Sequence, residues 1–470
     1  MSKTNRDFRI LDKDLGRISN AEAASIESFR PVIRLGIGLL FVAMAALISF
    51  GAFGDHPALG IIVAGVAVSA YLALSIGAND VANSLGPAVG AGAIGMTTGL
   101  VLVGILQIAG AVLAGDQVAG RLADGIVLPG IGDYSSARVM LAALLAAASW
   151  ISLATWAGAP VSTTHTIVGA IAGAGIATHG WGAVNWPGMA TIALGWMISP
   201  LCAGLIAAAL MALLRRHILD TPDKLASARR LLPFAIAIMA ALFVLNVMLV
   251  SLRLDPSLSL IFAAILGGLG FWHARRAIDL QIAAQASPRA AMKVIFSLPL
   301  ALSALMMGFA HGSNDAANVT APLGAVLRAA EGPVEAMASW TPLLAGLGIA
   351  AGAMLFGRRL VHMVGSRITK LNSARAFCVS LATVITVLAA SAVGLPVSTT
   401  HVAVGGVFGI GFYREWRDSR RQRKSELLPI EENRRRHLVR RSHVRTIFGA
   451  WLISAPAAGL LGALCAWAVR

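Results

Sequence analysis

Long apolar runs alternate with short polar stretches along the chain from about residue 32 onward. Most runs are close to the ~20 residues that a membrane-spanning helix needs. About twelve or thirteen such segments can be recognised, over residues 32–53, 57–78, 98–115, 137–158, 161–178, 188–214, 231–252, 257–272, 294–311, 342–357, 376–394, 397–413 and 446–469. The pattern predicts an all-α polytopic membrane protein in which segments interrupted by Gly and Pro form broken or re-entrant helices.

Composition agrees with this prediction. The 470 residues are 57% hydrophobic and only 13% charged, and the mean hydropathy is +0.76, outside the range of soluble proteins. The net charge of +16 raises the question of nucleic acid. However, the basic residues lie in loops and tails between apolar runs, where the positive-inside rule accounts for them. We therefore expect a lipid bilayer as the surroundings and no nucleic-acid partner.

A short polar motif at residues 77–90 recurs at residues 312–325, so that Asp315 follows Asp80 by 235 residues. Each copy reads Asn-Asp-x-Ala-Asn between glycines and is followed by a proline. The paired amides are Asn79 with Asn314 and Asn83 with Asn318. A carboxylate within an apolar segment is costly and usually faces a bundle interior or a wet cavity. The Gly and Pro residues argue against one smooth helix at this motif.

A second motif is also duplicated. The segment 159–165, Ala-Pro-Val-Ser-Thr-Thr-His, returns as Leu-Pro-Val-Ser-Thr-Thr-His at 395–401. The segment 196–200, Trp-Met-Ile-Ser-Pro, returns at 451–455 as Trp-Leu-Ile-Ser-Ala. Three motifs in the same order in both halves indicate an internal duplication.

Charge predicts how the halves are oriented. The loop 116–136 has three aspartates and one arginine, whereas its counterpart 358–375 has five Lys or Arg residues and no acid. The loop 179–187 has no Lys or Arg, whereas its counterpart 414–445 is rich in Arg. Equivalent loops should then lie on opposite sides of the membrane, which makes the halves an inverted-topology repeat of the kind found in secondary transporters.

These boundaries divide the chain into six parts. We expect a cytoplasmic N-terminal segment at 1–31, with no cleaved signal peptide, and a first membrane repeat at 32–214. A basic connection with an extra helix follows at 215–256, and a second repeat at 257–413. A basic cytoplasmic loop at 414–445 and the last helix of the second repeat at 446–470 complete the chain.

The Pro-Val-Ser-Thr-Thr-His segments predict helix starts, because Pro is tolerated in the first turn and Ser and Thr are favoured caps. A helix that begins at membrane depth directs unpaired N–H groups and the positive end of its dipole into the site, which favours an anion. The hydroxyls add donors from both halves: Ser162, Thr163, Thr164, Ser398, Thr399 and Thr400. The alternative is that these hydroxyls bond to carbonyls of their own helices.

Neither aspartate has a Lys or Arg close by in its apolar surroundings, so a cation or a proton is its natural neutraliser. Oxygens from Asp and Asn and freed backbone carbonyls suit a hard monovalent cation. The alternative is a protonated aspartate with a structural hydrogen bond. An anion that enters against a negative-inside potential needs positive charge moving with it, so the two kinds of site together predict ion-coupled anion symport.

Other polar residues in apolar runs receive weaker interpretations. His165 and His401 end the Thr-Thr-His motifs, and we expect them to support the hydroxyl segment rather than carry protons. His311 has no counterpart in the first half, where Ile76 occupies its place, so we assign it no core role. Gln107 is a lone polar residue that we interpret as packing. Cys202, Cys378 and Cys465 are isolated, so neither a disulfide framework nor a zinc site is indicated.

The duplicated motifs, Gly77-Ala-Asn-Asp-Val-Ala-Asn-Ser with Gly312-Ser-Asn-Asp-Ala-Ala-Asn and the two Pro-Val-Ser-Thr-Thr-His segments, resemble the inorganic phosphate transporter (PiT) family. The resemblance covers about residues 60–468. It implies phosphate uptake coupled to sodium or protons through a duplicated, inverted and dimeric fold. The first apolar run and the residues before it look like additions to that common core.

By matching positions, the resemblance assigns the coupling cation, and sodium if sodium is used, to Asp80 and Asp315 with Asn83 and Asn318. It assigns phosphate to the six hydroxyl residues, with Asn79 and Asn314 close by. Co-transported sodium ions or protons are the only cofactor-like species that it implies.

The sequence therefore predicts a multi-pass inner-membrane symporter of inorganic phosphate, working by alternating access and without enzymatic activity. A sulfate or other oxyanion permease of the same fold is the nearest alternative, and a passive anion channel is another. An intramembrane aspartyl protease that uses Asp80 and Asp315 as a dyad is the most distant. A protease dyad would explain neither the duplicated Asn residues nor the Ser-Thr-Thr segments.

Overall fold

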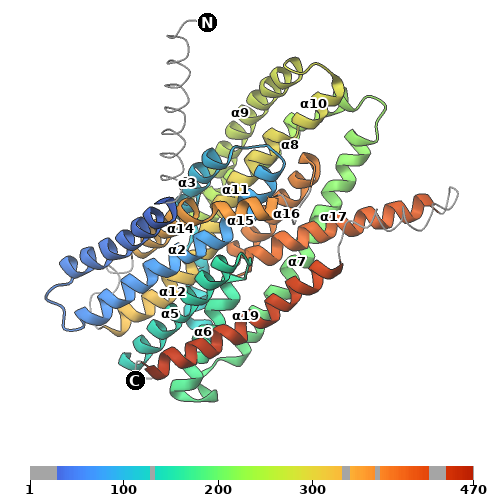
Figure 1. Ribbon diagram of the computed structural model, residues 1–470. Helices are drawn as coiled ribbons and strands as arrows, with labels where there is room; N and C mark the ends of the chain where they lie inside the picture. Colours follow the sequence, from blue (N-terminus) through green and yellow to red (C-terminus); the bar gives the residue numbers. More distant parts are fainter. Residues whose placement is uncertain (1–28, 127–132, 331–338, 366–370, 423–440, 469–470) are drawn as a thin grey trace, which may run out of the picture.

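The computed structural model describes residues 29–126, 133–330, 339–365, 371–422 and 441–468, and within them the chain is helical (Figure 1). Nine helices in these ranges are long and apolar enough to cross a membrane, and two shorter apolar helices accompany them. The all-α membrane fold is confirmed. The expected N-terminal segment at 1–31 lies almost wholly outside the described residues, as does most of the expected basic loop at 414–445.

The helices follow one another with short connections. The first half contains Phe29–Ala52, α2 Leu59–Gly90, α3 Met96–Ala114, α4 Asp116–Ile126, α5 Asp133–Ala157, α6 Thr163–His179, the 3₁₀ turn η1 Trp181–Ala183 and α7 Trp186–Leu214. The middle contains the π-helical turns η2 Arg215–Leu219 and η3 Val247–Ser251, with α8 Lys224–Asn246, α9 Pro256–Ala283 and α10 Pro288–Val294. The second half contains α11 Ser297–Asp315, α12 Ala317–Ala329, α14 Thr341–Phe356, α15 Arg358–Met363, α16 Ser373–Ala392, α17 Thr399–Gln422 and α19 Arg441–Ala468.

The helices α8 and α9, which lie between the two halves in sequence, form a hairpin at the edge of the bundle (Figure 1). Large apolar side chains such as Phe234, Ile238 and Phe262 are exposed on it. Exposed apolar surface of this extent fits contact with hydrocarbon rather than with water. The hairpin therefore widens the membrane-embedded body without contributing to its polar centre.

Several of the closest helix contacts occur in pairs, one from each half. A Cβ at Gly77 of α2 would collide with the backbone of Ile349 in α14, and a Cβ at Gly312 of α11 would collide with the backbone of Gln107 in α3. Small residues let membrane helices approach this closely. Because Gly77 and Gly312 occupy equivalent places in the duplicated motif, the duplication extends from the sequence to the packing of the helices.

The same pairing holds where the halves interlock. Gly169 of α6 packs on the backbone of Ala455 in α19, and Gly405 of α17 packs on the backbone of Pro200 in α7. The two glycines are equivalent in sequence, and so are their partners. The helix that begins with Ser-Thr-Thr-His in each half thus packs against a helix of the other half. The helices α6 and α19 run side by side (Figure 1).

The expectation of a helix break at residues 77–90 is wrong, because α2 is continuous from Leu59 to Gly90. Glycine in α2 serves close approach: Gly90 packs on Gly365 in the same way that Gly77 packs on α14. Pro87 lies in the last turn of α2. Proline cannot donate a backbone hydrogen bond, but the loss of one such bond is tolerated so close to the end of the helix. In the second copy Ala316 separates α11 from α12, but it keeps helical backbone angles of φ −57° and ψ −33°, so the chain does not break there either.

Candidate functional site

The helices α6 and α17 begin inside the protein rather than at its surface. Ser162 caps α6 by accepting a hydrogen bond from the N–H of His165 at 3.1 Å. In the other half, Ser398 accepts from the N–H of His401 at 3.3 Å. The predicted helix starts are confirmed, and the residues before them, Val161 and Val397, are buried. The first turn of each helix leaves N–H groups without an intrahelical partner.

Asn79 and Asn314 hold the chain just before these helix starts. The side-chain oxygen of Asn79 accepts from the N–H of Val161 at 3.2 Å, and that of Asn314 accepts from the N–H of Val397 at 3.3 Å. The amide of Asn79 also donates to Thr155 Oγ1 at 2.9 Å. These contacts give both asparagines a role in positioning the hydroxyl segments. Their predicted contact with substrate stays a prediction.

Two threonines connect the halves across the centre. Thr164 Oγ1 donates to the carbonyl of Val397 at 3.2 Å, and Thr400 Oγ1 lies 3.3 Å from the carbonyl of Val161. Each threonine therefore reaches the residue that precedes the opposite helix start. The Ser-Thr-Thr segments, which are 236 residues apart in sequence, form one structural unit.

The carboxylate of Asp80 accepts hydrogen bonds from both Ser-Thr-Thr segments. Thr163 Oγ1 donates to its Oδ2 at 2.8 Å, and Thr400 Oγ1 donates to its Oδ1 at 3.1 Å. Asn83 donates to Oδ1 at 3.2 Å and reaches Thr400 Oγ1 at 2.9 Å and Thr399 Oγ1 at 3.3 Å. Hydrogen bonds to a carboxylate are stronger than those between neutral groups, so a ligand that changes the charge of Asp80 also acts on both segments.

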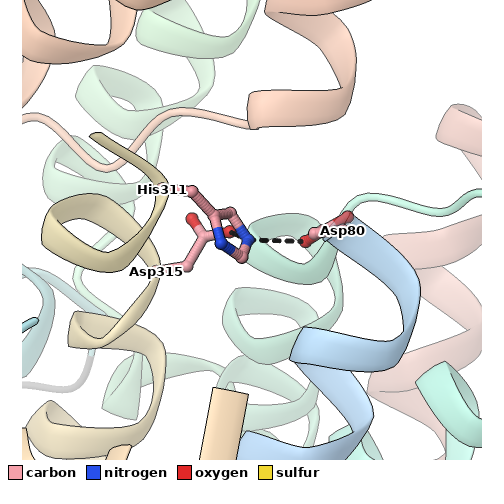
Figure 2. A group of neighbouring side chains, drawn as sticks. All are labelled: Asp80, His311 and Asp315. Carbon is pink, nitrogen blue, oxygen red and sulfur yellow. Dashed lines mark ion pairs between the residues drawn. The ribbon is translucent and has the colours of Figure 1, made fainter. Parts of the chain in front are cut away.

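Asp315 has different partners. Its Oδ1 accepts from Asn314 Nδ2 at 2.6 Å, and its Oδ2 lies 2.7 Å from His311 Nε2. The same nitrogen lies 3.9 Å from Asp80 Oδ2. Figure 2 shows the three side chains pointing toward one another, Asp80 from α2 and the other two from α11. One potential metal-ligating atom from each residue lies within 4.8 Å of the others.

The interpretation that gave His311 no core role is wrong, because its imidazole lies between the two aspartates. His311 is one helical turn before Asp315, so the i,i+4 spacing brings both side chains to one face of α11. The lack of a counterpart in the first half made His311 look incidental. His311 lies four residues before Asp315, a predicted site residue, and this spacing could have indicated from the sequence that the two side chains share a helix face.

Gln107 also has a more specific place than packing. Its Nε2 lies 2.9 Å from His311 Nδ1, and both side chains are fully buried. Gly312, next to His311, allows the backbone of α3 to approach here. Gln107 therefore belongs to the group of polar residues around the two aspartates.

Asn318, the counterpart of Asn83, is 1% exposed. Neither its amide nitrogen nor its oxygen has a hydrogen-bond partner within the described residues. A buried amide left unpaired costs about 1–3 kcal/mol, so a position of this kind fits a group that binds cargo during the transport cycle. The structure leaves its predicted role as a cation ligand open.

The two motif histidines meet behind the hydroxyl segments. The ring of His165 lies 4.3 Å from that of His401 in an edge-to-face arrangement and 3.8 Å from the ring of Trp196. Both rings follow directly on the threonines that cross between the halves. The supporting role that we expected for them stays a prediction, and their contact supplies a structural reason for it.

A large cavity lies away from the aspartates. It has a volume of about 1150 Å³ and opens between the end of α2, at Gly90, and the starts of α8 and α16. Arg215, Lys224 and Lys293 line it, and Asp220 lies 3.3 Å from Arg215. Gly90 is ten residues beyond Asp80, or about 15 Å along a helix with a rise of ~1.5 Å per residue. The cavity and the buried site are thus separate parts of the structure.

Comparison with known proteins places this arrangement in a family. Residues 76–462, which include both Asn-Asp motifs and both Ser-Thr-Thr-His motifs, match the sequence profile of the phosphate transporter family. The chain belongs to the phosphate transporter family. It is therefore a multi-pass membrane transport protein for phosphate and not an enzyme. Consistently, an imidazole lies between the aspartates that the protease alternative would use as a dyad.

Individual relatives agree over most of their length. A protein of Helicobacter pylori described as "Putative phosphate permease" is 33% identical, and the alignment covers 96% of this chain and 98% of the relative. One of Haemophilus influenzae with the same description is 36% identical over 73% of this chain and 86% of the relative. A solved structure, described as "The sodium-dependent phosphate transporter", is 31% identical with a TM-score of 0.77, covering 87% of this chain and 98% of that chain.

Proposed function

We propose that this transporter moves inorganic phosphate inward across the cytoplasmic membrane by symport with sodium ions or protons. Asp80 supports this most directly, because its carboxylate accepts hydrogen bonds from Thr163 of one Ser-Thr-Thr segment and Thr400 of the other. A cation that binds Asp80 withdraws charge from these hydrogen bonds and frees the hydroxyls for another partner. Cation binding and anion binding then share the same atoms, which is a physical basis for coupling.

Phosphate would bind between the starts of α6 and α17. The six hydroxyls of Ser162, Thr163, Thr164, Ser398, Thr399 and Thr400 and the first-turn N–H groups supply donors. An arginine, the usual clamp for an oxyanion, is missing from these segments. The positive charge would instead come from the coupling cations, which makes phosphate binding depend on them.

The cations would bind at Asp80 with Asn83 and at Asp315 with Asn318. Carboxylate and amide oxygens are ligands that hard cations prefer. The amide of Asn318, which has no hydrogen-bond partner within the described residues, favours a ligand there. We take sodium as the first candidate, because a structure at 31% identity is described as that of a sodium-dependent phosphate transporter.

Burial of the site supports the proposal of alternating access. Asp80 and Asp315 are at most 1% exposed, and the threonines around Asp80 are buried as well, so cargo reaches them only when helices move. We place the cavity at Gly90 on the cytoplasmic side, where the positive-inside rule puts the basic connection that begins at Arg215. Arg215, Lys224 and Lys293 outnumber Asp220 and Asp223 in its lining, so the cavity would attract phosphate as it leaves.

We also propose the inverted orientation of the two repeats, the inner-membrane location and a homodimeric state. The reciprocal packing of α6 with α19 and of α17 with α7 supports the duplication on which the first of these rests. Labelling of single cysteines from each side of sealed vesicles would test the orientation. Cross-linking in the membrane would test the dimer.

Uptake into proteoliposomes tests the proposed function. Purified protein would be reconstituted, and entry of labelled phosphate would be measured under a sodium gradient alone and under a pH gradient alone. We expect the sodium gradient to drive accumulation; accumulation with only the pH gradient would assign protons. Phosphate that equilibrates with no dependence on either ion would indicate a passive channel, and equal competition by sulfate would indicate a general oxyanion permease.

A further inference from the structure

We propose that Gln107 is a positioning residue that holds the His311 imidazole against the two aspartates and thereby sets the affinity of the site for its coupling cation. The proposal rests on the ion-coupled transport proposed above and adds a residue to it. Gln107 lies on α3, which carries no charged side chain from Met96 to Ala114. Its amide is the polar group that α3 brings to the centre of the site.

The first step is the proton on His311. Its Nε2 lies 2.7 Å from one carboxylate oxygen and 3.9 Å from the other. An ionised carboxylate is an acceptor only, so we infer that the nitrogen that faces the two aspartates carries the hydrogen. In the neutral ring, Nδ1 is then an acceptor, and it needs a donor because the site is buried.

The second step is the partner of Nδ1. Gln107 Nε2 lies 2.9 Å from it and supplies that donor. The tautomer and orientation of an imidazole are set by the hydrogen bond that its other nitrogen makes. Without the amide, the ring is free to take the tautomer or rotamer that turns a lone pair toward Asp315, and the aspartates lose the N–H between them.

The third step is that close packing of the helices does not require Gln107 and His311. In the mirrored place of the other half, Gly77 packs on the backbone of Ile349, just as Gly312 packs on that of Gln107. The residue before Gly77 is Ile76, which is buried in the same apolar cluster as Ile349. Two buried isoleucines therefore occupy in one half the positions that His311 and Gln107 occupy in the other.

The fourth step links the pair to cation binding. Residues that orient the ligands of a bound ion typically change its affinity by about 10–100-fold when they are replaced. Within the described residues, the side-chain amide of Gln107 bonds to His311 and to neither the hydroxyl segments nor Asp80. Its loss should therefore raise the cation concentration needed for half-maximal uptake and leave the KM for phosphate at saturating cation nearly unchanged.

The experiment compares full-length Gln107→Leu with wild type in proteoliposomes, with sodium as the probe. We expect the half-maximal sodium concentration to rise about tenfold, in the range for orienting residues, with little change in the KM for phosphate. Ile349→Leu at the mirrored position is the matched control and should leave both unchanged. Sodium-dependent thermal stabilisation of the purified variants gives a readout that does not depend on uptake.

The double variant Gln107→Leu with His311→Asn separates positioning from packing. If Gln107 acts through His311, replacing it in the His311→Asn background adds no further shift in the sodium requirement. Unchanged sodium dependence in Gln107→Leu, or an equal shift with and without His311, would overturn the proposal. Wild-type protein without any cation-dependent uptake would instead overturn the proposed function, so the two failures are distinguishable. If Gln107→Leu does not fold, Gln107→Met supplies the test, because it keeps the length of the side chain but removes the donor to Nδ1.

Discussion

Asp80 and Asp315 occupy equivalent places in the two halves of the chain, yet their side chains have different neighbours. Asp80 accepts hydrogen bonds from Thr163, Thr400 and Asn83. Asp315 accepts from Asn314 and contacts His311. The first carboxylate is therefore tied to the hydroxyl segments, and the second is tied to an imidazole on its own helix.

The helix packing around these residues is much more alike than their polar contacts. The glycines that precede each Asn-Asp pair meet the backbone of a neighbouring helix in the same way. The residues at the contact differ, with Ile76 and Ile349 in one half and His311 and Gln107 in the other. Duplication has kept the shape of the interface, because close packing tolerates little change in volume, while its polarity has diverged.

The comparison indicates a division of labour between the two aspartates. Replacing Asp80 acts on both hydroxyl segments, whereas replacing Asp315 acts on the imidazole and the cation. The four predictions that follow test this division and the likeness of the packing, beginning with the change of largest expected effect.

Asp80→Asn should reduce phosphate uptake by about 100-fold or more, because several hydrogen bonds to a charged group are weakened at ~1.5–3 kcal/mol each. Both the KM for phosphate and the sodium requirement should change, measured by uptake into proteoliposomes. Asp116→Asn, at an exposed aspartate, is the control and should behave as wild type. Normal uptake by both Asp80→Asn and Asp315→Asn would mean that the aspartates are structural and the site lies elsewhere.

Asp315→Asn should raise the half-maximal sodium concentration by at least the ~10–100-fold typical of replacing a residue that only orients an ion's ligands, because Asp315 is itself a proposed ligand. The KM for phosphate at saturating sodium should change less than in Asp80→Asn, because within the described residues the Asp315 carboxylate contacts Asn314 and His311 rather than the hydroxyl segments. Sodium titrations of uptake at fixed phosphate would measure this. Identical defects in the two variants would remove the proposed division of labour.

Gly77→Ala and Gly312→Ala should each destabilise the protein by the ~1–3 kcal/mol typical of overpacking or more, because the added Cβ meets backbone that cannot give way. Thermal unfolding in detergent would measure the loss. Gly36→Ala is the control, since nothing lies within 4 Å of its Cβ. A large loss in only one of the two variants would contradict the equivalence of the two interfaces.

Thr163→Val should impair uptake by about tenfold, because Asp80 loses a hydroxyl donor worth ~1.5 kcal/mol. Thr399→Val, at the equivalent place in the other half, should cost about threefold or less, because its hydroxyl accepts only a neutral hydrogen bond from Asn83. Initial rates of phosphate uptake at subsaturating phosphate would rank the two variants. The reverse ranking would show that the hydroxyls matter through phosphate alone rather than through Asp80.

Much of the site could be predicted from the sequence because its motifs occur in both halves of the chain. A single copy of Asn-Asp-x-Ala-Asn or of Ser-Thr-Thr-His leaves a purely structural role open, and the recurrence of both motifs at a common offset indicated that they act together. The structure brings Asp80, Asn83 and the threonines into contact as that offset implied. Duplication failed as a guide at His311 and Gln107, which occur once and have apolar counterparts.

The sequence by itself determined the membrane-embedded helical fold, the internal duplication and most of the polar residues at the centre. These follow from local properties: run length, residue type and spacing. Only the tertiary structure decided that α2 passes unbroken through its Asn-Asp motif and that His311 lies between the aspartates. Both outcomes depend on contacts between helices far apart in the chain, Gly77 with Ile349 and Gln107 with His311. A glycine that breaks a helix and one that lets two helices touch are alike in sequence, and their neighbours in space distinguish them.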